Sequence, residues 1–313
     1  MTVNKPILIT IITMSLIVTL ALLASVVYLS SETQRQGGTD HGSISHKLES
    51  RSKPAQVYEF MEESALDAVE DKEYDAAVGI FSAMRPLARG FTDKKRYLDC
   101  TEKLADLSLD KTENYAKATE LFQELLQEKK ESGSPKEMAS LKLRHGKAEL
   151  GYGSYQEAIK ILQEALGKIT ATGDKKLEAD CNYSIADAKM YLHEWQAAIP
   201  YAEKALDLLL KNPQLGDKLE MAKYYQELGL CKFHTGRLVE AADLIEKSIA
   251  LSKEAGKTEA ELVSDLRNLG WLYLSMGDKE KSKSYLEKVA ELESSDSSES
   301  SGSTAEAYIL RRF

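Results

Sequence analysis

Two stretches decide the fold: YYQELGLCKFHTGRLVEAADLIEKSI at residues 224–249 and LRNLGWLYLSMGDKEKSKSYLEKV at residues 266–289. In each, apolar residues recur at helical spacing, a glycine then interrupts the pattern, and a second apolar stripe follows. The interrupting residues, Gly236 and Gly277, suit the left-handed turn that ends many helices, because glycine adopts a positive φ without a steric penalty. Each stretch is therefore predicted to be a hairpin of two antiparallel helices.

The same pattern recurs along most of the chain on either side of these stretches. It reads EYDAAVGIF, NYAKATELF, SYQEAIKIL, EWQAAIPYA, RLVEAADLI and DKEKSKSYL, and its shared small residue is Ala77, Ala118, Ala158, Ala198, Ala241 and Ser282. The intervals between these residues are 41, 40, 40, 43 and 41. A period this regular is typical of stacked helical hairpins.

These segments resemble the tetratricopeptide repeat, which has small residues at its eighth, twentieth and twenty-seventh positions. By this resemblance the eighth positions hold Ala65, Asp106, Gly146, Ala186, Gly229 and Gly270. Two helices approach closely only where neither carries a bulky side chain, and large residues fill the groove beside the contact. Asp106 at such a contact, and Met84 and Leu125 at twenty-seventh positions, show that the first two repeats depart from the pattern.

The resemblance covers residues 54–293 and implies an all-α fold, a right-handed superhelix of about six stacked antiparallel hairpins. The period is longer than the family's common value of about 34 residues, so the helices are expected to be about a turn longer. Long-repeat members such as kinesin light chain and the Leu-Gly-Asn-repeat scaffolds are similar in this respect.

Local signals predict where individual helices begin. Ser134-Pro135-Lys136-Glu137 combines an N-cap serine, a proline at the first helical position and a glutamate that completes a capping box. Ser154-Tyr155-Gln156-Glu157 is predicted to be a second capping box, and Asn212-Pro213 to start a further helix. Gly153, like Gly236 and Gly277, is expected at the turn between the two helices of a hairpin.

Residues 1–31 predict a transmembrane anchor. No charge lies between Lys5 and Glu32, which leaves an apolar stretch of 26 residues, 6–31. A helix of this length, rising about 1.5 Å per residue, exceeds the roughly 30 Å hydrocarbon core of a bilayer. A cleaved signal peptide is the alternative, but its apolar region usually has about 7–15 residues before a small-x-small site. A cleavage after Ala21 would cut the apolar run in half.

The regions beside the anchor and after the repeats have different compositions. A short lead containing Lys5 favours a cytoplasmic amino terminus, and so places the repeats on the non-cytoplasmic side. Residues 32–53, rich in Ser, Gly, Gln and His, are interpreted as a flexible tether. The tail at 294–313 is Ser-rich and is predicted to be disordered. Its end, 308–313, is compatible with docking onto the groove or a partner, and equally with a frayed end.

Composition and motifs argue against catalysis and against nucleic acid as a ligand. The net charge of −9 argues against nucleic acid as the main ligand, because phosphate binding needs a basic face. His193-Glu194 begins like a zinc-protease motif, but Ala197 replaces the second histidine, so no metal is predicted. No cofactor and no small-molecule substrate are expected either. The carboxylates are interpreted as pairing with lysines on exposed helix faces. The three cysteines are interpreted as buried small hydrophobes.

The family's pattern implies that the first helix of each hairpin lines a concave surface that binds partner proteins. The predicted partner-binding residues are Tyr183, Asp187, Met190, Tyr191, Gln226, Phe233, Arg267 and Trp271. Aromatic side chains suit partly wet interfaces, which favours a peptide groove. The alternative is a superhelix so tight that successive inner helices cover these residues.

The predicted function is therefore that of a membrane-anchored adaptor that catalyses nothing and binds a protein or peptide partner on its concave face. The alternative is a structural assembly scaffold of a membrane complex that uses the convex face or the ends of the array. A clamp for a terminal carboxylate is not expected, because Leu107 stands where that specialised group needs an asparagine.

Overall fold

The structure is a computed structural model that describes residues 54–90 and 93–296. The predicted anchor at 1–31, the tether at 32–53 and most of the tail lie outside the described residues. Among the helices that are described, none is both long and apolar enough to cross a bilayer. The chain divides into two compact units, Met1–Glu131 and Ser132–Phe313, which are described separately.

The described part of the first unit contains two helical hairpins, and each of these helices packs against the next along the chain. Its helices are α3 (Pro54–Glu70), α4 (Tyr74–Gly90), α5 (Lys94–Asp110) and α6 (Tyr115–Glu128). Its core holds Tyr58, Phe81, Leu104 and Phe122, whose side chains are almost completely buried.

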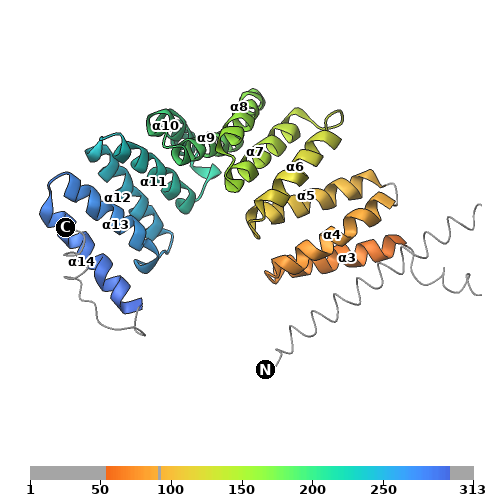
Figure 1. The fold of residues 1–313 in the computed structure, drawn as a ribbon, viewed down its shortest axis with the longest axis horizontal. Coiled ribbons are helices and arrows are strands. Elements are labelled where there is room, and N and C mark those ends of the chain that lie inside the picture. The colour runs from red at the N-terminus through yellow and green to blue at the C-terminus, as the bar shows by residue number, and fades with distance from the viewer. Residues whose placement is uncertain (1–53, 91–92, 297–313) are drawn as a thin grey trace, which may run out of the picture. The chain divides into compact units, whose positions relative to one another are not determined.

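Residues 132–296 of the second unit contain four helical hairpins, drawn from green to blue in Figure 1. Its helices are α7 (Pro135–Tyr152), α8 (Tyr155–Thr172), α9 (Lys175–Tyr191), α10 (Trp195–Lys211), α11 (Lys218–His234), α12 (Leu238–Glu254), α13 (Val263–Ser275) and α14 (Lys279–Asp296), with 3-10 turns η1 (Pro213–Leu215) and η2 (Ala260–Leu262). Each helix packs on the next in sequence, and α9 also contacts α7 and α11. The predicted all-α hairpin architecture is confirmed.

The close helix contacts occur where the repeat predicts them. All six repeated small residues, from Ala77 to Ser282, are buried. A β-carbon added at Gly229 would lie 2.8 Å from Ile245 Cγ1, and one added at Gly270 would lie 2.8 Å from Leu286. Since real contacts are not that short, these glycines are required for the two helices of a hairpin to approach.

The second repeat is displaced by one residue from the predicted register. Ala105 is fully buried at the helix contact, whereas Asp106 is only half-buried. A carboxylate in the tight contact between two helices would lose its hydration, so the helix places alanine there instead. Met84 and Leu125 are fully buried, which shows that larger residues fill this position in the first unit.

The predicted helix starts are confirmed in part. Ser134 accepts a hydrogen bond from the Glu137 amide, 3.2 Å away, ahead of Pro135. The Ser154 capping box was wrong, because that side chain makes no capping bond. The start at Asn212 is confirmed only for a short 3-10 helix, η1, which begins at Pro213; the α-helix α11 begins after Asp217, whose side chain accepts a hydrogen bond from the Glu220 amide.

The turns inside the hairpins and the cysteines agree with their predictions. Gly153, Gly236 and Gly277 have φ values of 89°, 77° and 81°, in the left-handed region that glycine favours. Cys100, Cys181 and Cys231 are buried and free. Burial raises the thiol pKa of all three to about 12, which keeps them protonated and unreactive.

Candidate functional site

The candidate site lies where the first helices of three consecutive hairpins meet. We call this surface, formed by side chains of α9, α11 and α13, the inner face. Lys176 of α9 pairs with Glu220 of α11. Farther along α11, the Gln226 amide donates a hydrogen bond to Asp265 of α13. The inner face is thus held by contacts between helices about forty residues apart in sequence.

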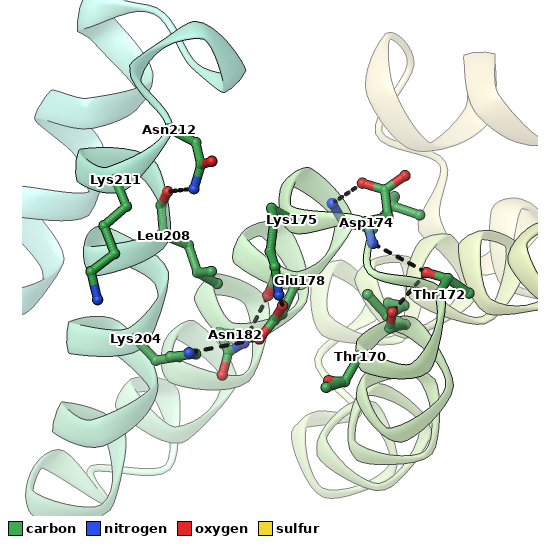
Figure 2. A network of polar contacts seen from close by, with 12 residues as sticks. Thr170, Thr172, Asp174, Lys175, Glu178, Asn182, Lys204, Leu208, Lys211 and Asn212 are labelled. Carbon is green, nitrogen blue, oxygen red and sulfur yellow. Dashed lines mark hydrogen bonds and ion pairs between the residues drawn. The ribbon is translucent and has the colours of Figure 1, made fainter.

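The amino-terminal end of α9 is fixed by a network of compensated charges, shown in Figure 2. Asp174 caps the helix by accepting a hydrogen bond from the Leu177 amide at 3.1 Å. The Glu178 carboxylate is buried between two ammonium groups, those of Lys175 at 2.8 Å and Lys204 at 3.8 Å. Every charge in this network has a partner, so it orients α9 against α10 and leaves nothing for a ligand.

A pair of stacked tyrosines joins α9 to α11 in the middle of the inner face. The rings of Tyr183 and Tyr224 lie 4.4 Å apart between centroids, at 15° to each other. The Tyr224 hydroxyl donates to Asp180 at 3.1 Å. Burial is the main cause, and nearby carboxylates the second, that raise the pKa of both tyrosines well above its usual value. Both hydroxyls therefore stay protonated at neutral pH and can donate hydrogen bonds.

Next to this stack lie two carboxyl groups that make no ion pair within the described part of the chain, Asp187 of α9 and Glu227 of α11. Burial raises the pKa of Asp187 to about 6. Burial is the main cause, and repulsion from Asp187 the second, that raise the pKa of Glu227 well above its usual range. The Tyr183 hydroxyl and the Lys223 ammonium favour the charged form of Glu227 but do not outweigh its burial. The Glu227 Oε2 atom is buried without any hydrogen-bond partner.

Two further predicted residues, Gln226 and Arg267, are engaged within the chain. Gln226 bonds to Asp265, whose pKa is raised by burial. Arg267 pairs with Glu293 of α14 through its Nη2 atom, while its buried Nε–H has no acceptor. Both side chains therefore support the packing of α13, and only part of their polar capacity is available to a partner.

The apolar predicted residues are half-buried rather than covered. Met190 packs against the core between α9 and α11, and Phe233 against the core formed by α12 to α14. Phe233 also meets the ring of His234 edge-on at 5.2 Å. Trp271 is half-buried on α13. Whether these side chains bind a partner stays a prediction, but each keeps some accessible surface.

Tyr191 differs from the other predicted residues in its surroundings. Its side chain is 56% exposed, and its ring stacks in parallel on Tyr155 of α8, with centroids 4.9 Å apart. This stack joins it to the preceding hairpin.

The sequence did not identify Tyr224, Glu227 or Asp265 as members of the inner face. The prediction that carboxylates lie on exposed faces beside lysines was wrong for Asp187, Glu227 and Asp265. Glu227 stands four residues after Lys223, which by itself is typical of a solvent-exposed helical ion pair. The repetition of an acid on three consecutive first helices was the signal that could have revealed the cluster.

A cavity in the first unit provides a contrast. It has a volume of about 200 Å³ and is lined by Ala88, Arg89, Asp93, Lys94, Tyr97 and Glu128. Its acids and bases are balanced, and Lys94 pairs with Glu128 at 3.1 Å. The uncompensated carboxyl groups of the inner face make a stronger candidate for binding a charged group.

Comparison with known proteins supports the repeat assignment. Two family profiles, both of the tetratricopeptide repeat, match residues 183–255 and 220–292. A search of curated proteins found no match. Among solved structures, BtubC (BKLC) from P. vanneervenii is similar at 20% identity and a TM-score of 0.57, covering 79% of this chain and 94% of that chain.

Two other solved structures are also similar. Aspartyl phosphate phosphatase F from Bacillus subtilis has 15% identity and a TM-score of 0.58, covering 75% of this chain and 70% of that chain. A signal transduction ATPase (STAND) with a tetratricopeptide repeat sensor, from Pyrococcus horikoshii, has 18% identity and a TM-score of 0.63, covering 76% of this chain but 36% of that chain. At these identities the likeness establishes the fold alone. The tetratricopeptide repeats predicted from the sequence are thus confirmed for residues 183–292, within an all-α fold of stacked helical hairpins.

Proposed function

We propose that this chain is a protein-interaction adaptor whose inner face, on α9, α11 and α13, holds an extended segment of a partner protein. Tetratricopeptide repeats are in general non-enzymatic adaptors or scaffolds, and the proposal assigns no catalysis to this chain. The observation that carries it is the row of half-buried Met190, Phe233 and Trp271 on successive first helices. Side chains of this kind anchor interfaces, because they still lose apolar surface to a partner.

The polar groups of the inner face support the same proposal. The tyrosine stack and the Gln226–Asp265 bond hold the helices in a fixed arrangement before any partner arrives. A preorganised surface loses little conformational entropy on binding, so more of the contact free energy appears as affinity. An extended segment suits such a face because it can contact three helices in turn.

The test compares Phe233→Ala and Trp271→Ala with the matched control Val239→Ala. Val239 is also a large apolar residue, 64% exposed, but it lies on the second helix α12. Full-length chains, purified in detergent, capture partners from the source membranes after their helical content has been checked by circular dichroism. We expect the two inner-face variants to lose partners that the Val239 variant retains. Retention of the same partners by all three would refute the groove.

Membrane attachment through residues 1–31 is a further part of the proposal, and it rests on the 26 uncharged residues at 6–31. The repeats are proposed to lie on the non-cytoplasmic side, from the position of Lys5. A protease-protection assay on intact vesicles tests both points. Protection of the repeats in sealed vesicles with the cytoplasmic side outward is the expected result. Extraction of the chain by carbonate without detergent would contradict the anchor.

The alternative function, a structural assembly scaffold, has one specific observation in its favour. Phe60 and Leu66 on α3 are 61% and 47% exposed, so the first described helix presents two large apolar side chains that a partner could cover. Phe60→Ser with Leu66→Ser would then reduce the size of the native complex on a blue native gel. If those substitutions reduce it while Phe233→Ala and Trp271→Ala leave it unchanged, the scaffold function replaces the adaptor.

A further inference from the structure

The repeat fold does not need two of the carboxyl groups on the inner face. Burying a carboxylate is unfavourable unless a cation or several hydrogen-bond donors compensate it. Elsewhere the chain supplies such cations: Lys176 lies 3.1 Å from Asp180, and Lys175 lies 2.8 Å from the buried Glu178. Asp187 and Glu227 have no ion pair with any part of the chain that the structure describes.

We propose that Asp187 and Glu227 together bind the guanidinium group of an arginine in the partner segment. This inference rests on the proposed function, since it requires a segment on the inner face. The cluster alone would not identify a ligand, but the buried Glu227 Oε2 atom lacks a hydrogen-bond partner. A buried acceptor without a donor is unfavourable, so a ligand that provides one gains affinity from satisfying it.

Arginine fits this pair better than other side chains. Its planar guanidinium carries five N–H donors and remains charged at any physiological pH, so one group can bond to carboxylates on two different helices. Lysine has a more strongly hydrated charge without this planar geometry. The net charge of the chain, −9, also favours a partner of opposite sign at long range.

The competing explanation is that Glu227 is simply a protonated structural residue, held beside Tyr183. The two explanations differ in what Glu227→Gln does. If the group is structural, glutamine keeps its shape and polarity, and binding is unchanged. If it is a ligand for a cation, it gives up its proton when arginine binds and becomes a carboxylate, so glutamine keeps the fold but removes the group that can take on this charge.

The experiment uses full-length protein in detergent and immobilised peptide pools with random flanks and one fixed central residue. The fixed residue is arginine, lysine, or citrulline, which has nearly the shape of arginine but no charge. We expect the arginine pool to retain the chain about tenfold more strongly than the citrulline pool, because the loss of a buried charge partner is large. Asp187→Asn and Glu227→Gln should each abolish that difference.

The matched control is Asp207→Asn, which removes an acid from the second helix α10, where Asp207 pairs with Lys211 at 2.8 Å. This variant should keep the arginine preference. Three results would overturn the inference. The arginine and citrulline pools could retain the chain equally, or the lysine pool could retain it as strongly as the arginine pool. The third such result is an arginine preference that survives both inner-face substitutions. In those cases Phe233→Ala still tests the proposed function independently, through loss of binding to every pool. Retention of no pool by the unsubstituted chain contradicts both proposals.

Discussion

Replacing Asp187 by asparagine should stabilise the second unit at neutral pH. In the folded chain, burial raises the Asp187 pKa from 3.8 to about 6. A carboxyl group with a raised folded pKa contributes fully to stability only below its unfolded pKa, and that contribution is lost as the pH rises through the folded pKa. Asparagine has nearly the shape of the neutral acid and never becomes charged.

The magnitude follows from the two pKa values. A difference of one pKa unit corresponds to about 1.36 kcal/mol, so Asp187→Asn should gain about 3 kcal/mol at about pH 7.5 and about 1 kcal/mol at about pH 4.5. These values are upper bounds, because local relaxation and entry of water reduce the penalty for a buried charge. Removing Asp187 also relieves its repulsion of Glu227, which adds to the gain.

The assay is urea unfolding followed by far-ultraviolet circular dichroism at both pH values, with amide hydrogen exchange of α9 and α11 to localise the effect. Local measurement is needed because repeat arrays can unfold one part at a time. The same measurements on Asp207→Asn provide the control, since that residue has an ion-pair partner. A loss of stability in Asp187→Asn, or a gain that is the same at both pH values, would refute the reasoning.

Three other predictions concern the fold around the site. Gly229→Ala should destabilise the chain by about 1 kcal/mol, because the added β-carbon would overpack against Ile245 and this cost exceeds the gain in helix propensity. Gly167→Ala, whose added β-carbon meets nothing within 4 Å, should instead stabilise it by about 0.5–1 kcal/mol. The urea midpoint should therefore fall for the first variant and rise for the second. Asp174→Ala removes the N-cap of α9 and should cost about 1 kcal/mol, seen as faster exchange at the start of that helix. Burial, and to a smaller extent the nearby His193, lowers the pKa of His234 in the folded chain. The free energy of unfolding should therefore fall as the pH drops below the unfolded histidine pKa of 6.5. His234→Asn should weaken this pH dependence in urea unfolding measured over a series of pH values.

The repeats were predictable from sequence because their main requirement is local and periodic. Gly229 and Ala241 stand twelve residues apart and belong to the same hairpin, and a β-carbon on Gly229 would lie 3.4 Å from the Ala241 carbonyl oxygen. This contact depends on helix geometry and one turn, both of which the sequence records directly. The second repeat differed by one residue because the choice between Ala105 and Asp106 depends on hydration, which the spacing alone does not encode.

The charge state of the inner face was not predictable, because it depends on contacts between hairpins. Asp187 and Glu227 are forty residues apart; Asp187 stands between two alanines and Glu227 between Gln226 and Leu228, and neither neighbourhood records which acids the next hairpin covers. Their burial results from the approach of α9 to α11, which the stacked rings of Tyr183 and Tyr224 hold together. The N-cap at Ser154 failed for a similar reason, since composition identifies a capable side chain but not the hydrogen bond that it makes.

The two halves of α9 show how stability and recognition are divided within one helix. At its start, the N-cap Asp174 is paired with Lys136 at 2.8 Å and the buried Glu178 with two lysines, so both acids have cations and the helix start is fixed. In the second half, Asp187 has no ion pair within the described residues. An array selected for rigidity alone would gain by compensating that acid, as it does earlier in the same helix. The uncompensated half is therefore where a positively charged partner gains most, because its charge removes a penalty that the folded chain already carries.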